Sequence, residues 1–294
     1  MNTVSSASRG LMGRAVLLAR LVKIEHSIFA LPFAYTGLFL AARGWPGFRA
    51  FFLVTLAMVA IRSFAMAVNR LLDLPIDRVN PRTQKRELVT GEVSVGRAWI
   101  FTGLCAAVFV AACAGLNSLC LALSVPALIW AGLYSLTKRF TALCHVFLGS
   151  VLGLAPLAGW LAVSPAFALT PLLFALGVTF WVAGFDILYS LQDEEFDREM
   201  GLHSVPARFG RAQALTLSTC CHVNTAVFFG LAGLSAGLSA IYFTIYALVA
   251  GVLLFEHTLI SARDISRVNV AFFTLNGVVA VAVFAGVLAD LAWG

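Results

Sequence analysis

The chain has 294 residues, of which 61% are hydrophobic and 12% are charged. Soluble domains carry about 25% charged residues, so this composition excludes an ordinary soluble protein and indicates a partner in the lipid bilayer. The formal net charge is +6. This positive charge does not indicate nucleic-acid binding, because the chain has no basic domain outside the apolar runs.

Apolar runs follow one another along the chain, and most have the roughly 20 residues that a spanning helix needs. They lie near residues 27–42, 51–68, 98–116, 118–136, 144–163, 170–190, 213–232, 234–256 and 269–289. The first is short, and the junctions near 117 and 233 require very tight turns. Transmembrane strands would alternate over about 10 residues, so a barrel is excluded. We predict an all-α membrane protein of about nine transmembrane helices, with residues 1–294 in one domain.

Basic residues are distributed unevenly between the two sides of the membrane. Lys and Arg gather before the first run and after the second, fourth, sixth and eighth, whereas only Arg43 and Arg49 lie in the opposite connections. Segments rich in Lys and Arg stay in the cytoplasm. We therefore expect a multi-pass protein of the inner (cytoplasmic) membrane whose Lys- and Arg-rich face is cytoplasmic.

A line of oxygen-bearing side chains ends the second apolar run. Asn69, Asp73 and Asp77 are four residues apart, so on a helix they share one face. Pro75 should break that helix and leave Asp77 on a loop. Arg70 stands within the same segment, where it either reduces the number of carboxylate ligands or contacts a bound anion.

A second line ends the sixth run, on the same side of the membrane. Asp193 and Asp197 are four residues apart, and Asp186 lies seven residues before Asp193. Crowded carboxylates repel one another unless a cation lies between them, and oxygen-only donors suit Mg²⁺. We predict that both lines bind Mg²⁺ and a diphosphate at the cytoplasmic lipid boundary. The predicted metal ligands are Asn69, Asp73, Asp77, Asp186, Asp193 and Asp197, of which Asp73, Asp77, Asp193 and Asp197 are the catalytic carboxylates.

The two lines also indicate a faint internal repeat. The first line follows span two and the second follows span six, four spans later. Two pseudo-repeated four-helix units would bring the acidic helix ends together across a central cavity. Glu194 and Glu195 point away from the second line and are expected to be solvated, although Glu194 is close enough in sequence for contact with a loop Arg.

These motifs resemble those of the UbiA superfamily of intramembrane prenyltransferases. The pattern N-x-x-x-D-x-x-x-D begins at Asn69, and D-x-x-Y-x-x-x-D-x-x-x-D begins at Asp186. Further matches are Asn80-Pro81-Arg82-Thr83, Arg86-Glu87-Leu88, Tyr134-x-x-x-Lys138-Arg139 and Ser204-Val205-Pro206-Ala207-Arg208-Phe209-Gly210. The likeness is greatest to quinone-pathway enzymes of the 4-hydroxybenzoate type. Lys23-Ile24-Glu25-His26-Ser27 and Ser266-Arg267-Val268-Asn269-Val270-Ala271-Phe272-Phe273 also resemble the branch that acts on a dihydroxynaphthoate.

The resemblance implies a transferase that moves a polyprenyl group from polyprenyl diphosphate to an aromatic acid acceptor, either 4-hydroxybenzoate or 1,4-dihydroxy-6-naphthoate. Two Mg²⁺ ions would bridge the diphosphate, and basic residues would complete the clamp. Aromatic rings would shield the allylic cation that forms. The residues nominated for substrate binding are Arg62, Arg70, Arg82, Arg86, Tyr134, Lys138, Arg139, Tyr189 and Arg208.

Arg62 is the one of these basic residues that lies well inside a span, seven residues before Asn69 and so on the same helix face, about 10 Å deeper. A charged group costs at least ~2.5 kcal/mol at this depth and usually faces a polar cavity. We hypothesise that Arg62 binds the acceptor carboxylate or supports the metal ligands; a purely structural ion pair is the alternative. His26 and His145 lie at cytoplasmic span ends, where a packed or interfacial role is expected and contact with a metal ligand is the alternative.

A different class of function also uses membrane carboxylates. A cation-coupled secondary transporter would place its site near the midplane on interrupted helices, whereas these carboxylates lie at span ends among basic loops. Within the superfamily, chlorophyllide, haem or a glycerol-phosphate ether would be other acceptors. The resemblance disfavours them, although residue chemistry alone does not.

Overall fold

Long apolar helices build almost the whole protein, as expected from the composition. The computed structural model describes residues 17–18, 20–22 and 30–294. In that part of the chain, eight helices are long and apolar enough to cross a membrane, and α2 is a shorter apolar helix of 12 residues. Besides α2 (Leu31–Ala42), the bundle contains α3 (Phe48–Leu72), α5 (Val95–Leu116), α6 (Ser118–Thr137), α7 (Cys144–Val163), α8 (Leu169–Ser190), α11 (Arg211–Ala236), α12 (Ala240–Leu259) and α14 (Asn276–Trp293).

The predicted fold class is confirmed, with two changes in detail. The expected turn near 117 exists, because α5 ends at Leu116 and α6 begins at Ser118. Asn117 makes this possible: its amide oxygen accepts from the Cys120 N–H at 2.9 Å and its amide nitrogen donates to the Leu161 carbonyl at 2.8 Å. The expected turn near 233 is wrong. Helix α11 continues to Ala236 and ends at Gly237, whose φ of 69° favours glycine.

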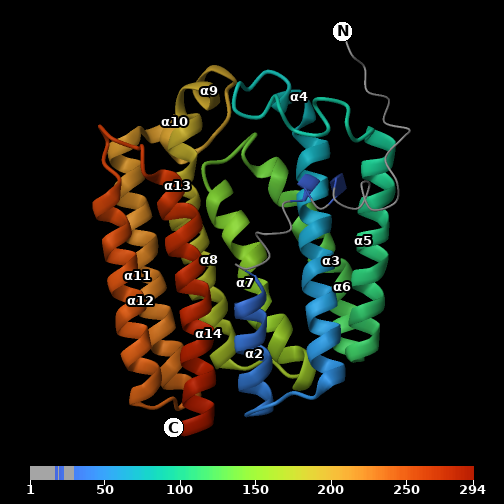
Figure 1. The fold of residues 1–294 in the computed structure, drawn as a ribbon, viewed down its shortest axis with the longest axis vertical. Helices are drawn as coiled ribbons and strands as arrows, with labels where there is room; N and C mark the ends of the chain where they lie inside the picture. The colour runs from blue at the N-terminus through green and yellow to red at the C-terminus, as the bar shows by residue number, and fades with distance from the viewer. Residues whose placement is uncertain (1–16, 19, 23–29) are drawn as a thin grey trace.

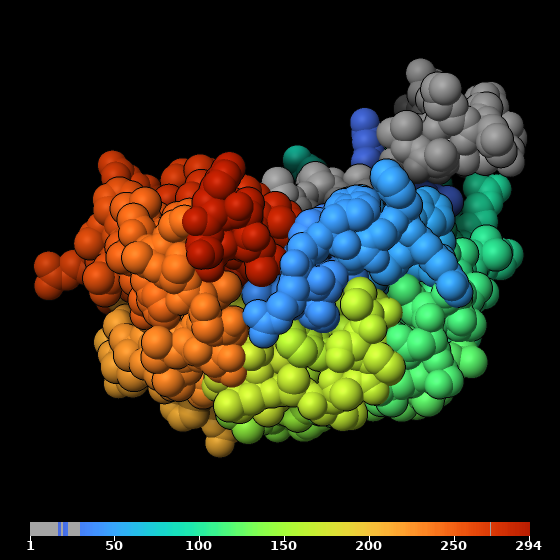
Figure 2. Space-filling model, turned by 90° about the horizontal axis from the view of Figure 1, so that it is seen from below, coloured from blue at the N-terminus to red at the C-terminus, as the bar shows by residue number. Residues whose placement is uncertain are grey.

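The helices follow one another around a bundle (Figure 1). The end view in Figure 2 shows the colours in sequence order around the molecule, and α14 contacts both α12 and α2, which closes the ring. The short elements α4 (Leu74–Asp77), α9 (Glu194–Glu199) and α10 (Val205–Phe209) cover one end in Figure 1, opposite the C-terminus. A π-helical turn, η4 (Ala271–Leu275), and the short α13 (Val268–Val270) precede α14.

Small residues allow the central helices to approach closely. A side chain at Gly159 of α7 would overlap the Ala34 carbonyl of α2, and one at Gly37 would overlap the Pro156 carbonyl of α7. Gly149 of α7 makes a similar approach to α8. Without a hydrophobic driving force between helices in lipid, close backbone packing of this kind holds them together. These contacts fix α7 between α2 and α8.

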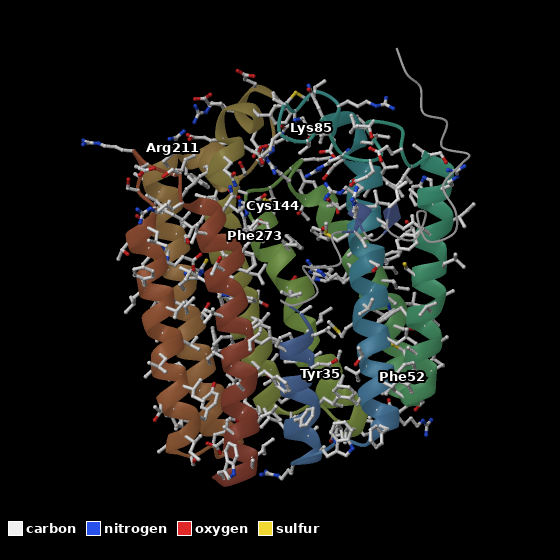
Figure 3. All side chains as sticks on the ribbon, in the orientation of Figure 1. Tyr35, Phe52, Lys85, Cys144, Arg211 and Phe273 are labelled. Atoms are coloured by element: carbon white, nitrogen blue, oxygen red, sulfur yellow. The ribbon has the colours of Figure 1, made fainter. Side chains whose placement is uncertain are left out.

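Both acidic lines lie at the end covered by the short elements. Helix α3 carries the first line into α4, and α8 carries the second through the 3₁₀ turn η3 (Leu191–Asp193) into α9. In Figure 3 the labelled Lys85 and Arg211 lie at this same end, whereas Phe52 lies toward the other. The ends of α3 and α8 are therefore placed to form one polar site.

Candidate active site

One cavity of about 370 Å³ brings the two acidic lines together. Its wall includes fourteen of the fifteen residues nominated from the sequence: Arg62, Asn69, Arg70, Asp73, Asp77, Arg82, Arg86, Tyr134, Lys138, Arg139, Asp186, Tyr189, Asp193 and Asp197. Apolar side chains of α3, α7 and α8 line the remaining wall, including Met58, Leu148, Leu152 and Val182. The cavity thus joins a charged region to an apolar region.

The first acidic line keeps its alignment although its helix is interrupted. Helix α3 ends before Asp73, and Pro75 stands in the first turn of α4, where its missing N–H leaves no hydrogen bond unmade. The Asp73 N–H bonds the Asn69 carbonyl at 2.9 Å, and the Asp77 N–H bonds the Asp73 carbonyl at 2.8 Å. The expected break at Pro75 is present, but Asp77 lies in a short helix and not on a loop. The Asn69 amide also donates to the Asp73 carboxylate at 2.8 Å.

Basic side chains bind the carboxylates of this first line. Arg86 donates to both oxygens of Asp77 at 2.6 Å. Arg139 lies 3.5 Å from the Asp73 carboxylate and donates to the Leu72 carbonyl at 2.6 Å. Burial raises the pKa of Asp73, and the negative charge of Asp77 raises it further, against the opposing effect of Arg139. The line therefore concentrates negative charge that favours a cation.

The second line is bound by basic residues from other parts of the chain. Arg82 forms a two-pronged pair with Asp193, with Nε 2.8 Å from one oxygen and a terminal nitrogen 2.5 Å from the other. Asn80 donates to the same carboxylate at 3.3 Å, and Lys138 lies 2.8 Å from the Asp197 carboxylate. Burial opposes the charge of Arg82, but the bonds to Asp193 outweigh it and raise the pKa of Arg82. Arg82 thus connects the segment after α3 to the end of α8.

The carboxylates offer oxygen ligands to a hard cation. They do not yet surround a common point as the ligands of a bound metal ion would. Among the described residues, no group of three or more His, Cys, Asp or Glu side chains is arranged to hold a metal ion. Asp73, Asp77, Asp193 and Asp197 each have a basic partner instead. The donor chemistry, oxygen-only on two facing lines, fits Mg²⁺.

An aromatic wall lies beside the charged region. The Arg82 guanidinium lies 5.5 Å from the centre of the Tyr189 ring, and the Tyr189 and Phe272 rings are 4.2 Å apart. The ring of Phe185 follows at 5.3 Å from that of Phe272. Phe272 belongs to the π-helical turn η4, an irregularity common at functional sites. These faces provide a surface for a developing carbocation.

Two of the nominated arginines lie in other surroundings. Arg70 is only 3% exposed, and its Nε donates to the Leu21 carbonyl at 3.3 Å, so it holds the short stretch 20–22 as well as lining the cavity. Arg208 is exposed, does not line the cavity, and lies over the ring of Phe209 at 6.0 Å. The structure brings every nominated residue except Arg208 to one site.

Three further residues emerge that the sequence pattern did not nominate. His145, at the start of α7, lies 2.7 Å from Asp186, which favours the alternative of contact with a predicted metal ligand over the expected packing role. Asn80 bonds Asp193. Glu194 is 8% exposed and bonds Arg198 and Arg211, so its expected solvation is wrong, and its Arg partners lie on α9 and α11 and not on a loop. The His26 segment lies outside the described residues.

Comparison with known proteins gives the family. Residues 30–278 match the model of the UbiA prenyltransferase family. The chain is 32% identical over 284 residues to the 4-hydroxybenzoate octaprenyltransferase of Azoarcus sp. (strain BH72), covering 95% of this chain and 98% of that one. The corresponding protein of Paraburkholderia phymatum is 29% identical over 288 residues, covering 96% and 99%.

Solved structures agree with this match. A UbiA homolog from Aeropyrum pernix K1 has a TM-score of 0.82 and 38% identity, covering 91% of this chain and 98% of that chain. A UbiA homolog from Archaeoglobus fulgidus bound to GPP and Mg²⁺ has a TM-score of 0.74 at 23% identity, covering 94% and 99%, and shows likeness of fold.

A helical bundle with facing acidic lines at one end of its cavity defines an intramembrane enzyme with a charged site. The chain belongs to the UbiA prenyltransferase family. The predicted resemblance is thereby confirmed, as is the enzyme class, a prenyltransferase of the 4-hydroxybenzoate type. The transporter alternative is not retained.

Proposed function

We propose that this protein transfers a polyprenyl group from polyprenyl diphosphate to a hydroxylated aromatic acid in quinone biosynthesis. The observation that carries the proposal is the division of one cavity into a charged end, built on both acidic lines, and an apolar remainder. A polyprenyl diphosphate has the same division between its head and its tail. The relatives named 4-hydroxybenzoate octaprenyltransferase support an aromatic acceptor.

The two acidic lines are the proposed binding groups for Mg²⁺. The homolog from Archaeoglobus fulgidus bound to GPP and Mg²⁺ supports this cofactor. When bound, Mg²⁺ supplies charge stabilisation to the diphosphate leaving group. The residues that would hold it are Asn69, Asp73 and Asp77 on the first line and Asp186, Asp193 and Asp197 on the second.

The basic residues beside these carboxylates hold the diphosphate in our proposal. Arg82, Arg86, Lys138 and Arg139 line the cavity and present N–H donors at the same place where the acidic lines end. Guanidinium groups bind phosphate oxygens through paired hydrogen bonds, which fix the head and stabilise its developing charge. Arg70, which is buried in the cavity wall, adds positive charge near the diphosphate. Arg208 is not part of the proposal, because it lies outside the cavity.

The prenyl carbon then becomes electrophilic as its C–O bond breaks. The Tyr134, Tyr189 and Phe272 rings line the cavity and shield the allylic cation from water. The electron-rich acceptor ring forms the new C–C bond and loses one ring proton, which restores its aromaticity. Arg62 lines the same cavity two helical turns below Asn69. It binds the acceptor carboxylate or supports the metal ligands.

The acceptor is 4-hydroxybenzoate or 1,4-dihydroxy-6-naphthoate. The names of the relatives favour the first. The segment 266–273, which resembles the naphthoate branch, includes α13 and the first part of η4 and places Phe272 in the cavity wall, so it is positioned to influence the acceptor. Its companion segment, 23–27, lies outside the described residues.

The proposed location is the inner membrane, with the cavity opening toward the cytoplasm. Lys85, in the basic segment after α3, and Arg211, at the start of α11, lie at the same end as both acidic lines (Figure 3), and segments rich in Lys and Arg remain cytoplasmic. A diphosphate that is too polar for lipid would enter from this side.

A prenylation assay on the detergent-purified protein tests the proposal. Geranyl and longer diphosphates are supplied with Mg²⁺, with each acceptor in parallel, and products are identified by mass spectrometry. Product from one acceptor is the expected result. Binding of the diphosphate without product from either acceptor would refute the aromatic acceptor, and absence of diphosphate binding would refute the reaction class.

A further inference from the structure

A buried histidine links three elements at the charged end of the cavity. His145 is the second residue of α7, is 3% exposed, and lines the cavity. Its neighbour Cys144, labelled in Figure 3, marks the end of α7 that lies beneath the covering loops. One ring nitrogen of His145 faces Asp186 of α8, and the other faces the backbone of Val205 at the start of α10.

The backbone contact determines where the imidazole carries its proton. The Val205 N–H donates to Nε2 of His145 at 3.1 Å. A backbone N–H can only donate, so Nε2 must accept and carries no proton. A neutral imidazole with an unprotonated Nε2 has its proton on Nδ1, which lies 2.7 Å from the Asp186 carboxylate. His145 therefore donates one hydrogen bond to Asp186 as a neutral group.

Asp186 differs from the other carboxylates of the site in the charge of its partner. Asp73, Asp77, Asp193 and Asp197 have Arg or Lys partners, whereas the partner found for Asp186 is an uncharged ring. A neutral donor fixes the orientation of the carboxylate without cancelling its charge. Hydrogen bonds of this kind to ligating groups orient them and tune the affinity for metal.

We propose that His145 is a positioning residue that holds Asp186 in place for a hard divalent cation, while Val205 holds His145 in the Nδ1-protonated form. The proposal rests on the proposed function, through the role of Asp186 as a metal ligand. It also gives a role to the segment Ser204-Val205-Pro206. Val205 is the first residue of α10, where a backbone N–H has no partner within the helix and remains available to His145.

Two substitutions separate this role from simple packing. In His145→Asn the amide nitrogen takes the place of Nδ1, so the donor to Asp186 is kept and the contact with Val205 is lost. In His145→Gln the amide lies near the former Nε2, so the contact with Val205 is kept and the donor to Asp186 is lost. A packing role predicts that His145→Asn, the smaller replacement, is at least as damaging as His145→Gln, whereas the positioning role predicts that His145→Gln is the more damaging.

The first measurement is independent of metal and activity. The full-length protein, labelled with ¹⁵N-histidine and held in lipid nanodiscs, gives NMR signals that distinguish protonated from unprotonated ring nitrogens. The signals missing from His145→Gln are those of His145. We expect a neutral ring protonated at Nδ1; a ring protonated at Nε2 would overturn the proposal.

The second measurement is binding of Mn²⁺, followed by loss of the free-ion EPR signal, without prenyl donor or acceptor. We expect His145→Gln to weaken binding by about tenfold, as for other residues that orient metal ligands, and His145→Asn to stay within about threefold of the unsubstituted protein. Equal affinities for the two variants would overturn the positioning role alone, provided that the unsubstituted protein binds Mn²⁺. If the unsubstituted protein bound no Mn²⁺, the metal-ligand assignment of Asp186 would fall, and the positioning role with it.

Discussion

Replacement of Arg82 by alanine is the most direct test of the charged end of the cavity. Arg82 makes two charge-assisted bonds to Asp193, at 2.8 and 2.5 Å, and reaches the Tyr189 hydroxyl at 3.4 Å. Its side chain is 35% exposed and that of Asp193 is 9% exposed. The guanidinium is therefore partly desolvated but open to the cavity, where a diphosphate would meet it.

The expected size of the effect follows from these contacts. Loss of a positioned donor pair that stabilises the leaving group should cost about 2–3 kcal/mol in the transition state, or roughly 30- to 150-fold in kcat/KM. Arg82→Lys keeps the charge but cannot form the paired hydrogen bonds, so we expect a loss of about tenfold. Initial rates of prenylation over a range of diphosphate concentrations measure both values.

Arg78 provides the matched control, because it is an exposed arginine four residues earlier that does not line the cavity. Arg78→Ala should keep kcat/KM within about threefold, as expected for an exposed position away from the site. If Arg82→Ala were as active as Arg78→Ala, the assignment of Arg82 to the diphosphate would be wrong.

Three other perturbations test separate parts of the structure. Asp73→Ala should abolish turnover without preventing membrane insertion, and chelation of Mg²⁺ should do the same to the unsubstituted protein; activity retained by the inserted variant would contradict the metal assignment. Arg62→Lys should raise the KM for the aromatic acid, and an unchanged acceptor KM would exclude carboxylate binding by Arg62. Gly159→Ala would force its side chain against the Ala34 carbonyl, whereas nothing lies within 4 Å of an added side chain at Gly103. Gly159→Ala should therefore lose about 1–3 kcal/mol of stability and Gly103→Ala almost none, as measured by thermal unfolding in detergent. Equal melting temperatures of the two variants would show that the contact between α2 and α7 relaxes without cost.

Much of the bundle could be predicted because a spanning helix depends on its own residues. About 20 apolar residues satisfy their backbone groups within one helix, whatever the neighbours are. The eight runs from 51–68 onward therefore correspond closely to helices, from α3 to α14. The turn after α11 was misplaced because Gly233 and Gly237 are both candidate helix ends, and the helix continues past the first and ends at the second.

The alignment within each acidic line was also accessible from sequence. Spacing by four residues places side chains on one helix face, and the backbone bonds from Asn69 through Asp73 to Asp77 preserve this spacing across Pro75. Charge pattern and motif order then defined the class of enzyme. These are local properties, and they do not depend on how the helices pack.

Only the tertiary structure decided which charges meet. Arg82 and Asp193 are 111 residues apart, and His145 and Asp186 are 41 apart. Their contacts depend on α7 lying against α8 through small residues and on the loop after α4 reaching across the cavity. The sequence pattern placed Arg208 with the substrate and Glu194 in solvent, and neither lies there. The spacing of a motif specifies the face of one helix, whereas the partner on that face is set by the position of the neighbouring helices.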